Sequence, residues 1–115
     1  MILKEKVMSN KNNFRTFEEF NLSLLSEPDD AEIYLKVALE EYKNDGDTKA
    51  FLLALKSVAE AQGGIAKLAK KSTINRQNLY KLLNGKTEPK LTTFLKIMDG
   101  LNVELDFHVR NILGK

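Results

Sequence analysis

The apolar residues that follow Pro28 recur every three or four positions, which is the spacing of one face of an α-helix. Asp29 and Asp30 stand where such a helix begins, and Gly46 stands just after its end. The pattern therefore predicts a helix from about Asp30 to the residue before Gly46. Its predicted buried face consists of Ala31, Tyr34, Leu35, Ala38, Leu39 and Tyr42.

A second helical pattern runs from Thr48 to about Gln62, and the pair Gly63 and Gly64 ends it. After the two glycines the apolar segments become shorter and predict three short helices in succession. These cover residues 64–71, 75–85 and 91–102, with Pro89 in the last connecting loop.

After residue 102 the apolar positions alternate strictly with polar ones, which is typical of a β-strand. The apolar members of this pattern are Val103, Leu105, Phe107 and Val109. Because a single strand leaves its backbone donors and acceptors unpaired, we expect it to pair with an N-terminal segment or with the same strand of a second subunit. We favour pairing between two subunits, so these residues are candidates for dimerisation.

The chain before Pro28 divides into a polar part and an apolar part. Residues 1–15 are mostly polar and predict a flexible arm. Residues 14–25 carry many large apolar side chains, and residues 17–24 predict a short helix. We therefore predict an acidic helical extension over residues 16–46, a main domain over residues 47–102, and a C-terminal strand and tail over residues 103–115.

Length and composition narrow the class of protein. A chain of 115 residues has room for one hydrophobic core. No apolar run is long enough to span a membrane or to form a signal peptide, so we expect a cytoplasmic protein. With no Cys and a single His, His108, the sequence excludes disulfides, thiol catalysis and metal sites built from Cys or several His. We expect no enzyme activity and no cofactor, since Ser, His and carboxylates are not clustered around any loop.

The net charge of +2 is the sum of two oppositely charged segments. Residues 16–47 carry ten acidic side chains and two basic ones, whereas residues 64–90 carry seven basic side chains and one acidic one. This asymmetry predicts a polyanionic partner for the basic segment and a cationic partner for the acidic one. The simpler alternative is two solvated surfaces.

The basic segment has the spacing of a helix-turn-helix. Ala69 is small where two helices would cross, Ile74 seats the turn, and Asn75 can cap the second helix by accepting from the amides of Gln77 or Asn78. The second helix presents polar side chains outward that are suited to reading base edges. The predicted base contacts are Arg76, Gln77, Lys81, Asn75 and Asn78, and the predicted phosphate contacts are Lys86, Lys90, Tyr80 and Asn84. For Tyr80, packing against its own domain is an equal alternative.

Residues 48–103 resemble the lambda-repressor-like, XRE-type DNA-binding domain in the Leu68-Ala69 pair, the cap at Asn75 and the NGKT loop at residues 84–87. Residues 16–103, with the motif RQNLYKLL, are similar to addiction-module antidotes of the HigA type. The resemblance implies an all-α fold: a five-helix domain with an N-terminal helical extension, to which the pattern adds a short C-terminal β-strand. Thr73 and Asn102 stand where the family has Gly, so positive φ angles are expected there.

The resemblance also implies the partners, namely a HigB/RelE-like ribonuclease toxin and the operator DNA of the shared operon. Because helix-turn-helix proteins read two half-sites, a homodimer is expected. The aromatic Phe14, Phe17 and Phe20, beside the acidic helix, are the predicted toxin contacts. Two alternatives stay open: a free-standing repressor without a toxin, and an interaction module that has lost DNA binding.

Overall fold

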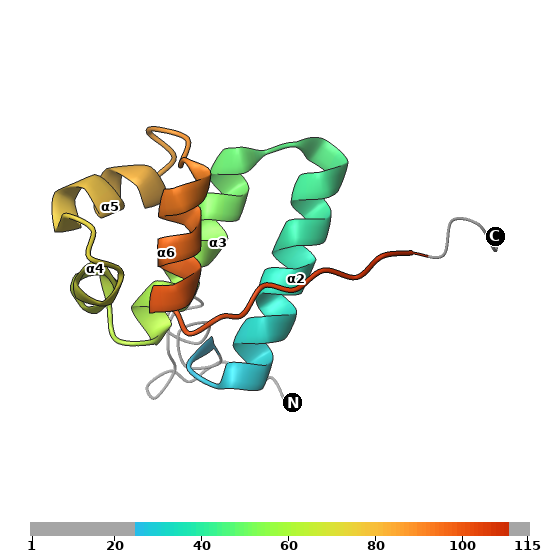
Figure 1. Cartoon of the computed structure of the whole chain (residues 1–115), viewed down its shortest axis with the longest axis horizontal. Helices are drawn as coiled ribbons and strands as arrows, with labels where there is room; N and C mark the ends of the chain where they lie inside the picture. The colour runs from blue at the N-terminus through green and yellow to red at the C-terminus, as the bar shows by residue number, and fades with distance from the viewer. Residues whose placement is uncertain (1–24, 111–115) are drawn as a thin grey trace, which may run out of the picture.

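The computed structural model describes residues 25–110, and this part of the chain is built from α-helices without any strand (Figure 1). For these residues the prediction of an all-α fold is confirmed, and each helix predicted between residues 28 and 102 is present. The helices are α2 (Pro28–Asp45), α3 (Thr48–Ala61), α4 (Ile65–Ser72), α5 (Arg76–Leu83) and α6 (Leu91–Gly100). Within the described residues, no helix is long and apolar enough to cross a bilayer.

Helices α2 and α3 form an antiparallel hairpin (Figure 1). Gly46 ends α2 in the left-handed conformation, with φ of 70°, and its amide donates to the carbonyl of Tyr42 at 2.7 Å. Asp47 then starts α3, because its side-chain oxygen accepts from the amide of Ala50 at 3.1 Å. One glycine and one capping residue are therefore enough to reverse the chain.

Helix α3 lies at the centre of the fold and contacts α2, α4 and α5, while α6 packs against α4. The core forms where these helices meet. Its largest side chains with almost no exposed surface are Leu52, Leu55, Val58, Leu79, Leu83 and Ile97. At the α4–α6 contact a Cβ on Gly100 would lie 2.7 Å from Leu68 Cδ1, so a larger residue at this position would require Leu68 to shift.

Helix α2 is more exposed than its sequence pattern predicts. Leu39 and Tyr42, predicted to be buried, have 43% and 37% of their surface exposed, so this part of the prediction was wrong. Ile33 and Val37 are exposed as well, and Ala31 is the buried residue of the helix. The physical reason is that α2 packs against α3 and against no other helix of the described chain, which covers only a narrow stripe of its surface.

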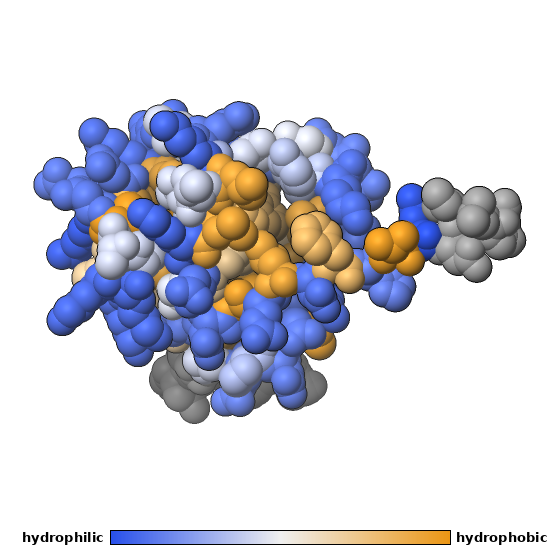
Figure 2. All heavy atoms as spheres, in the orientation of Figure 1, coloured by the Kyte–Doolittle hydropathy of each residue, from blue (hydrophilic) through white to orange (hydrophobic). Residues whose placement is uncertain are grey.

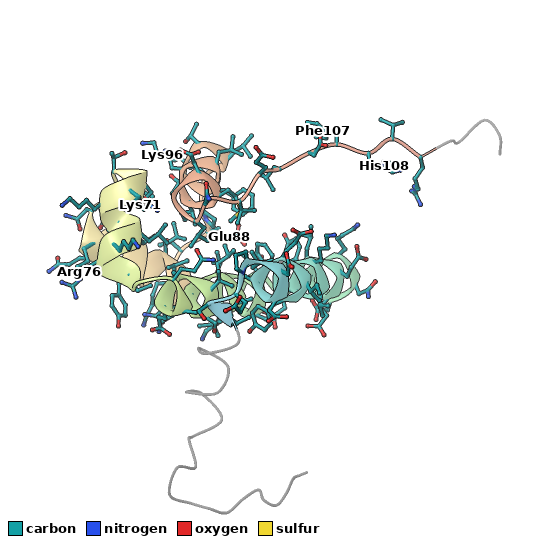
Figure 3. All side chains as sticks on the ribbon, turned by 90° about the horizontal axis from the view of Figure 1, so that it is seen from below. Lys71, Arg76, Glu88, Lys96, Phe107 and His108 are labelled. Atoms are coloured by element: carbon teal, nitrogen blue, oxygen red, sulfur yellow. The ribbon has the colours of Figure 1, made fainter. Side chains whose placement is uncertain are left out.

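The C-terminal β-strand predicted from Val103, Leu105, Phe107 and Val109 is absent from the described part of the single chain. Val103 packs against the core, but the following residues lead away from the helices (Figures 1 and 3). Leu105, Phe107 and Val109 have 53%, 96% and 86% of their surface exposed. A strand needs a ladder partner, and residues 25–110 of one chain do not supply one.

Candidate nucleic-acid interface

Helices α4 and α5 are joined by a three-residue turn at residues 73–75. Thr73 adopts the left-handed conformation with φ of 55° and ψ of 41°, as its place in the sequence predicts. The amide of Ile74 donates back to the carbonyl of Ala69 at 3.0 Å, which ends α4 in the pattern of a Schellman motif. The turn therefore fixes the angle at which the chain enters α5.

The residues around this turn hold the two short helices together. Ala69 is 6% exposed and belongs to the core cluster, where a larger side chain would have to displace its neighbours. Ile74 packs against the core cluster, and Ser72 is buried, with its hydroxyl donating to the carbonyl of Leu68 at 2.7 Å. The roles predicted for Ala69 and Ile74 agree with these positions.

Asn75 caps α5 as predicted. Its side-chain oxygen accepts from the amide of Gln77 at 2.9 Å and from that of Asn78 at 3.1 Å. Two of the amides that a helix leaves unpaired at its start are satisfied in this way. Because the oxygen of Asn75 is used within the chain, only its NH₂ group stays free to donate to a ligand.

The outward face of α5 brings four predicted contact residues together. Arg76, Gln77, Tyr80 and Lys81 line one open surface hollow with a volume of about 410 Å³, which we call the α5 hollow. All four side chains are exposed, whereas Leu79, Leu82 and Leu83 fill the opposite face of the helix. Figure 3 shows Arg76 directed into solvent at the end of the molecule formed by α4 and α5. Asn78 is exposed but does not line the hollow.

Lys56 of α3 is a neighbour of this face that the sequence did not reveal. Its ammonium donates to the side-chain oxygen of Asn84 at 2.8 Å and lies 5.3 Å from the centre of the Tyr80 ring. Tyr80 is 42% exposed, so its ring is not buried by this neighbour. Lys49, one heptad earlier on α3, lies with its aliphatic stem over Gly85. The seven-residue spacing of Lys49 and Lys56 indicates in the sequence that both lie on one face of α3. Only the packing of α3 against α5 shows that this face lies beside the end of α5.

The remaining predicted phosphate contacts follow α5. Gly85 has φ of 79°, and the amide of Lys86 donates to the carbonyl of Lys81 at 3.0 Å, so the chain turns sharply there. Lys86 and Lys90 are exposed in the loop before α6 and lie outside the α5 hollow. Asn84 ends α5, and its side-chain oxygen is held by Lys56.

Phe14, Phe17 and Phe20, the predicted toxin contacts, lie outside the described residues, as does the short helix predicted over residues 17–24. Their role stays a prediction.

Comparison with known proteins gives the class of the chain. Residues 16–109 match the family model described as probable addiction module antidote protein. An uncharacterized protein of Haemophilus influenzae is 30% identical over 80 residues, which cover 70% of this chain and 77% of that protein. No solved structure matches. The chain belongs to the probable addiction module antidote family, and a toxin is the partner that membership of this family implies.

Proposed function

We propose that this antidote binds operator DNA through α4 and α5, which act as a helix-turn-helix in a lambda-repressor-like domain, and thereby represses its own operon. The observation that carries the proposal is the α5 hollow, where Arg76, Gln77, Tyr80 and Lys81 converge on one solvent-facing side of a capped helix. An α-helix fits the major groove of B-DNA, and side chains near its N-terminus reach the base edges there.

The chemistry of these side chains assigns them different roles. Arg76 and Lys81 suit the acceptor pair of guanine, and Gln77 suits adenine, with each good bidentate pair contributing roughly 1–3 kcal/mol of discrimination. Asn75 and Asn78 complete the proposed base-contacting set through their NH₂ groups. Lys86, Lys90, Tyr80 and Asn84 are proposed to contact phosphates, which sets affinity and register.

We further propose that the antidote neutralises a ribonuclease toxin of the HigB/RelE-like kind and has no enzyme activity of its own. Support comes from membership of the antidote family and from the acidic character of α2, which suits a protein that binds RNA and is therefore basic. The phenylalanines at positions 14, 17 and 20 stay candidates for this contact.

We propose a homodimer as the DNA-binding form. Figure 2 shows apolar side chains gathered on the face that carries α6 and the chain leading from it. The exposed members are Leu91, Leu95, Leu105, Phe107 and Val109. An exposed apolar surface of this kind favours association, and two copies would place two α5 helices against two half-sites. Replacing Phe107 with Asp is expected to shift the molar mass in solution from that of a dimer to that of a monomer.

The test of DNA binding is a titration of the protein on a duplex that carries its own promoter, measured by fluorescence anisotropy beside an unrelated duplex. The double variant Arg76→Ala and Lys81→Ala should lose the preference for the promoter while its thermal unfolding stays nearly unchanged. Lys36→Ala, which removes a charge from α2, is the control. Equal binding of both duplexes by the wild-type chain would favour the interaction module over the repressor.

A second measurement separates the antidote from a free-standing repressor. If the product of the neighbouring gene in the operon binds the chain and is inactivated by it, the antidote function holds. If no neighbouring product binds while promoter binding persists, the free-standing repressor is the better description.

A further inference from the structure

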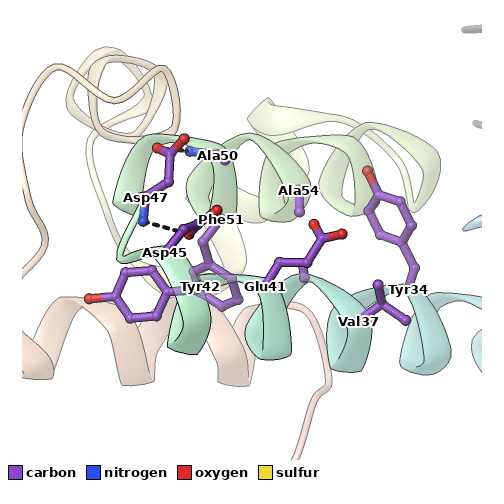
Figure 4. A pocket seen from close by; sticks show the side chains of 10 residues that line it. Tyr34, Val37, Glu41, Tyr42, Asp45, Asp47, Ala50, Phe51 and Ala54 are labelled. Atoms are coloured by element: carbon purple, nitrogen blue, oxygen red, sulfur yellow. Dashed lines mark hydrogen bonds between the residues drawn. The ribbon is translucent and has the colours of Figure 1, made fainter.

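Residues of α2, α3 and the turn between them line a groove, which Figure 4 shows from close by. Its volume is about 150 Å³, roughly that of a cavity which holds a benzene-sized group. We call it the α2–α3 groove. Its apolar lining comes from Tyr34, Val37, Ala38 and Tyr42 on α2 and from Phe51 and Ala54 on α3.

Three carboxylates line the same groove. Asp45 and Asp47 lie at the end where α2 turns into α3, and Glu41 is directed across the groove toward Ala54 (Figure 4). The two aspartates accept backbone hydrogen bonds, from the amides of Asp47 and Ala50, but neither is part of an ion pair within residues 25–110. The groove thus combines an apolar floor with concentrated negative charge.

The basic side chains of α2 do not neutralise this charge. Lys36 pairs with Glu32 at 3.2 Å and Lys43 pairs with Glu40 at 3.3 Å, and none of these four residues lines the groove. Within the described chain, Glu41, Asp45 and Asp47 therefore face the groove without a cationic partner. Such a site is complementary to a positively charged ligand.

The apolar lining is also only partly covered by the chain itself. Val37 is 52% exposed and Tyr42 is 37% exposed, although the ring of Tyr42 lies 5.9 Å from that of Phe51. Apolar side chains that stay exposed beside a hollow and are rimmed by charge are typical of a surface that binds another protein.

We propose that the α2–α3 groove docks a basic, amphipathic segment of the cognate toxin. One apolar side chain of that segment enters between Val37 and Phe51, and its Lys or Arg side chains pair with Glu41 and Asp45. This inference rests on the proposed function, because it assigns a surface to toxin binding. Because the α5 hollow and the α2–α3 groove share no residue, the proposal lets the antidote hold DNA and toxin together.

The test measures the affinity of the full chain for the purified product of the neighbouring gene in the operon. Glu41→Lys reverses one charge in the groove, and Glu32→Lys makes the same change about two and a half turns away, on the opposite face of α2. We expect the Kd to rise roughly tenfold or more for Glu41→Lys and less than twofold for Glu32→Lys. Val37→Ala should weaken binding severalfold, whereas Leu39→Ala, outside the groove, should not.

Each outcome has a distinct meaning. If the neighbouring product binds the wild-type chain but Glu41→Lys binds as tightly as Glu32→Lys, the groove is not the toxin site and the antidote function still stands. If the product does not bind the wild-type chain, both the proposed toxin neutralisation and this inference fail, whereas the proposed operator binding is judged by the promoter titration. Unchanged circular dichroism and unchanged promoter binding of the variants show that they are folded.

A photo-crosslinking amino acid in place of Val37 identifies what covers the groove in the full-length chain. A crosslink to the purified toxin supports the proposal, and the crosslinked peptide should be basic. A crosslink to residues 1–24 of the same chain, or to a second copy, that persists when toxin is present overturns it.

Discussion

The ammonium of Lys56 lies 2.8 Å from the side-chain oxygen of Asn84 and so ties the middle of α3 to the end of α5. The same ammonium lies 5.3 Å from the centre of the Tyr80 ring, within the range of a cation–π contact. The Lys56 side chain thus contacts two of the proposed phosphate-binding residues, Tyr80 and Asn84. Lys56 acts as a positioning residue for α5.

Lys56→Met keeps the aliphatic stem and removes the charge, so it tests this role. We expect promoter affinity to fall severalfold because Tyr80 and Asn84 lose their support. The free energy of unfolding should fall by about 1 kcal/mol, the net contribution of a typical hydrogen bond in a folded protein. Lys36→Met removes the same charge from α2 and should leave promoter affinity and the free energy of unfolding unchanged. If the two variants had equal effects, Lys56 would contribute only through the net charge of the protein.

Two variants of Asn75 distinguish its capping of α5 from its proposed contact with DNA. Asn75→Ala should lower the free energy of unfolding by about 1 kcal/mol, since two amides at the start of α5 lose their acceptor. Asn75→Asp keeps the acceptor and places a negative charge at a helix N-terminus, so the stability should be retained. The same variant should bind the promoter at least tenfold more weakly, because its carboxylate repels the DNA. Wild-type affinity of Asn75→Asp would place Asn75 outside the interface.

Thr73 tests the strain at the turn. Its φ of 55° brings a β-branched side chain into the left-handed region, which costs roughly 1–2 kcal/mol. Thr73→Gly should therefore raise the free energy of unfolding by about 0.5–1 kcal/mol after the extra entropy of glycine in the unfolded chain is subtracted. Asn102→Gly is the matched control, because Asn tolerates its φ of 63° and little should be gained there. The Thr73 hydroxyl donates to the backbone carbonyl of Ser72. Urea unfolding of both variants measures the effect, and a destabilised Thr73→Gly would show that this hydrogen bond outweighs the strain.

The salt dependence of binding tests Lys86 and Lys90. Each phosphate contact releases counterions, so a plot of the logarithm of the binding constant against the logarithm of the salt concentration has a negative slope. This slope should become less steep by about one for each of Lys86→Ala and Lys90→Ala. Both variants should bind the promoter and an unrelated duplex more weakly, and by the same factor. Lys56→Met, which acts through Tyr80 and Asn84, should leave the slope close to that of the wild type. A slope that does not change for Lys86→Ala or Lys90→Ala removes that residue from the interface.

Local signals made much of the helical layout predictable. Gly46, the pair of glycines at positions 63 and 64, and Asn75 each determine a helix end through backbone geometry or a side-chain hydrogen bond within three residues. The outward set on α5 was predictable for the same reason, since the apolar face of a short helix determines which polar residues remain outside.

Features that depend on distant packing were not predictable. Among the described helices only α3 packs against α2, and the apolar pattern of α2 does not reveal that Leu39 is left exposed. Lys56 and Asn84 are separated by 28 residues, and no local rule joins them. The alternation after Val103 describes a strand correctly only if a partner supplies the ladder, and that information is not present in the pattern.

Within residues 25–110, α2 packs against no helix other than α3, and this has a consequence for how the protein opens. With one face supported, α2 is expected to unfold locally while α3 to α6 stay folded, and its amide hydrogens should exchange with solvent well before those of the core. A ligand that binds only the closed hairpin slows this exchange by a factor set by its concentration and affinity. The lifetime of the amide hydrogens in α2 therefore measures directly the fraction of the antidote that has such a ligand bound.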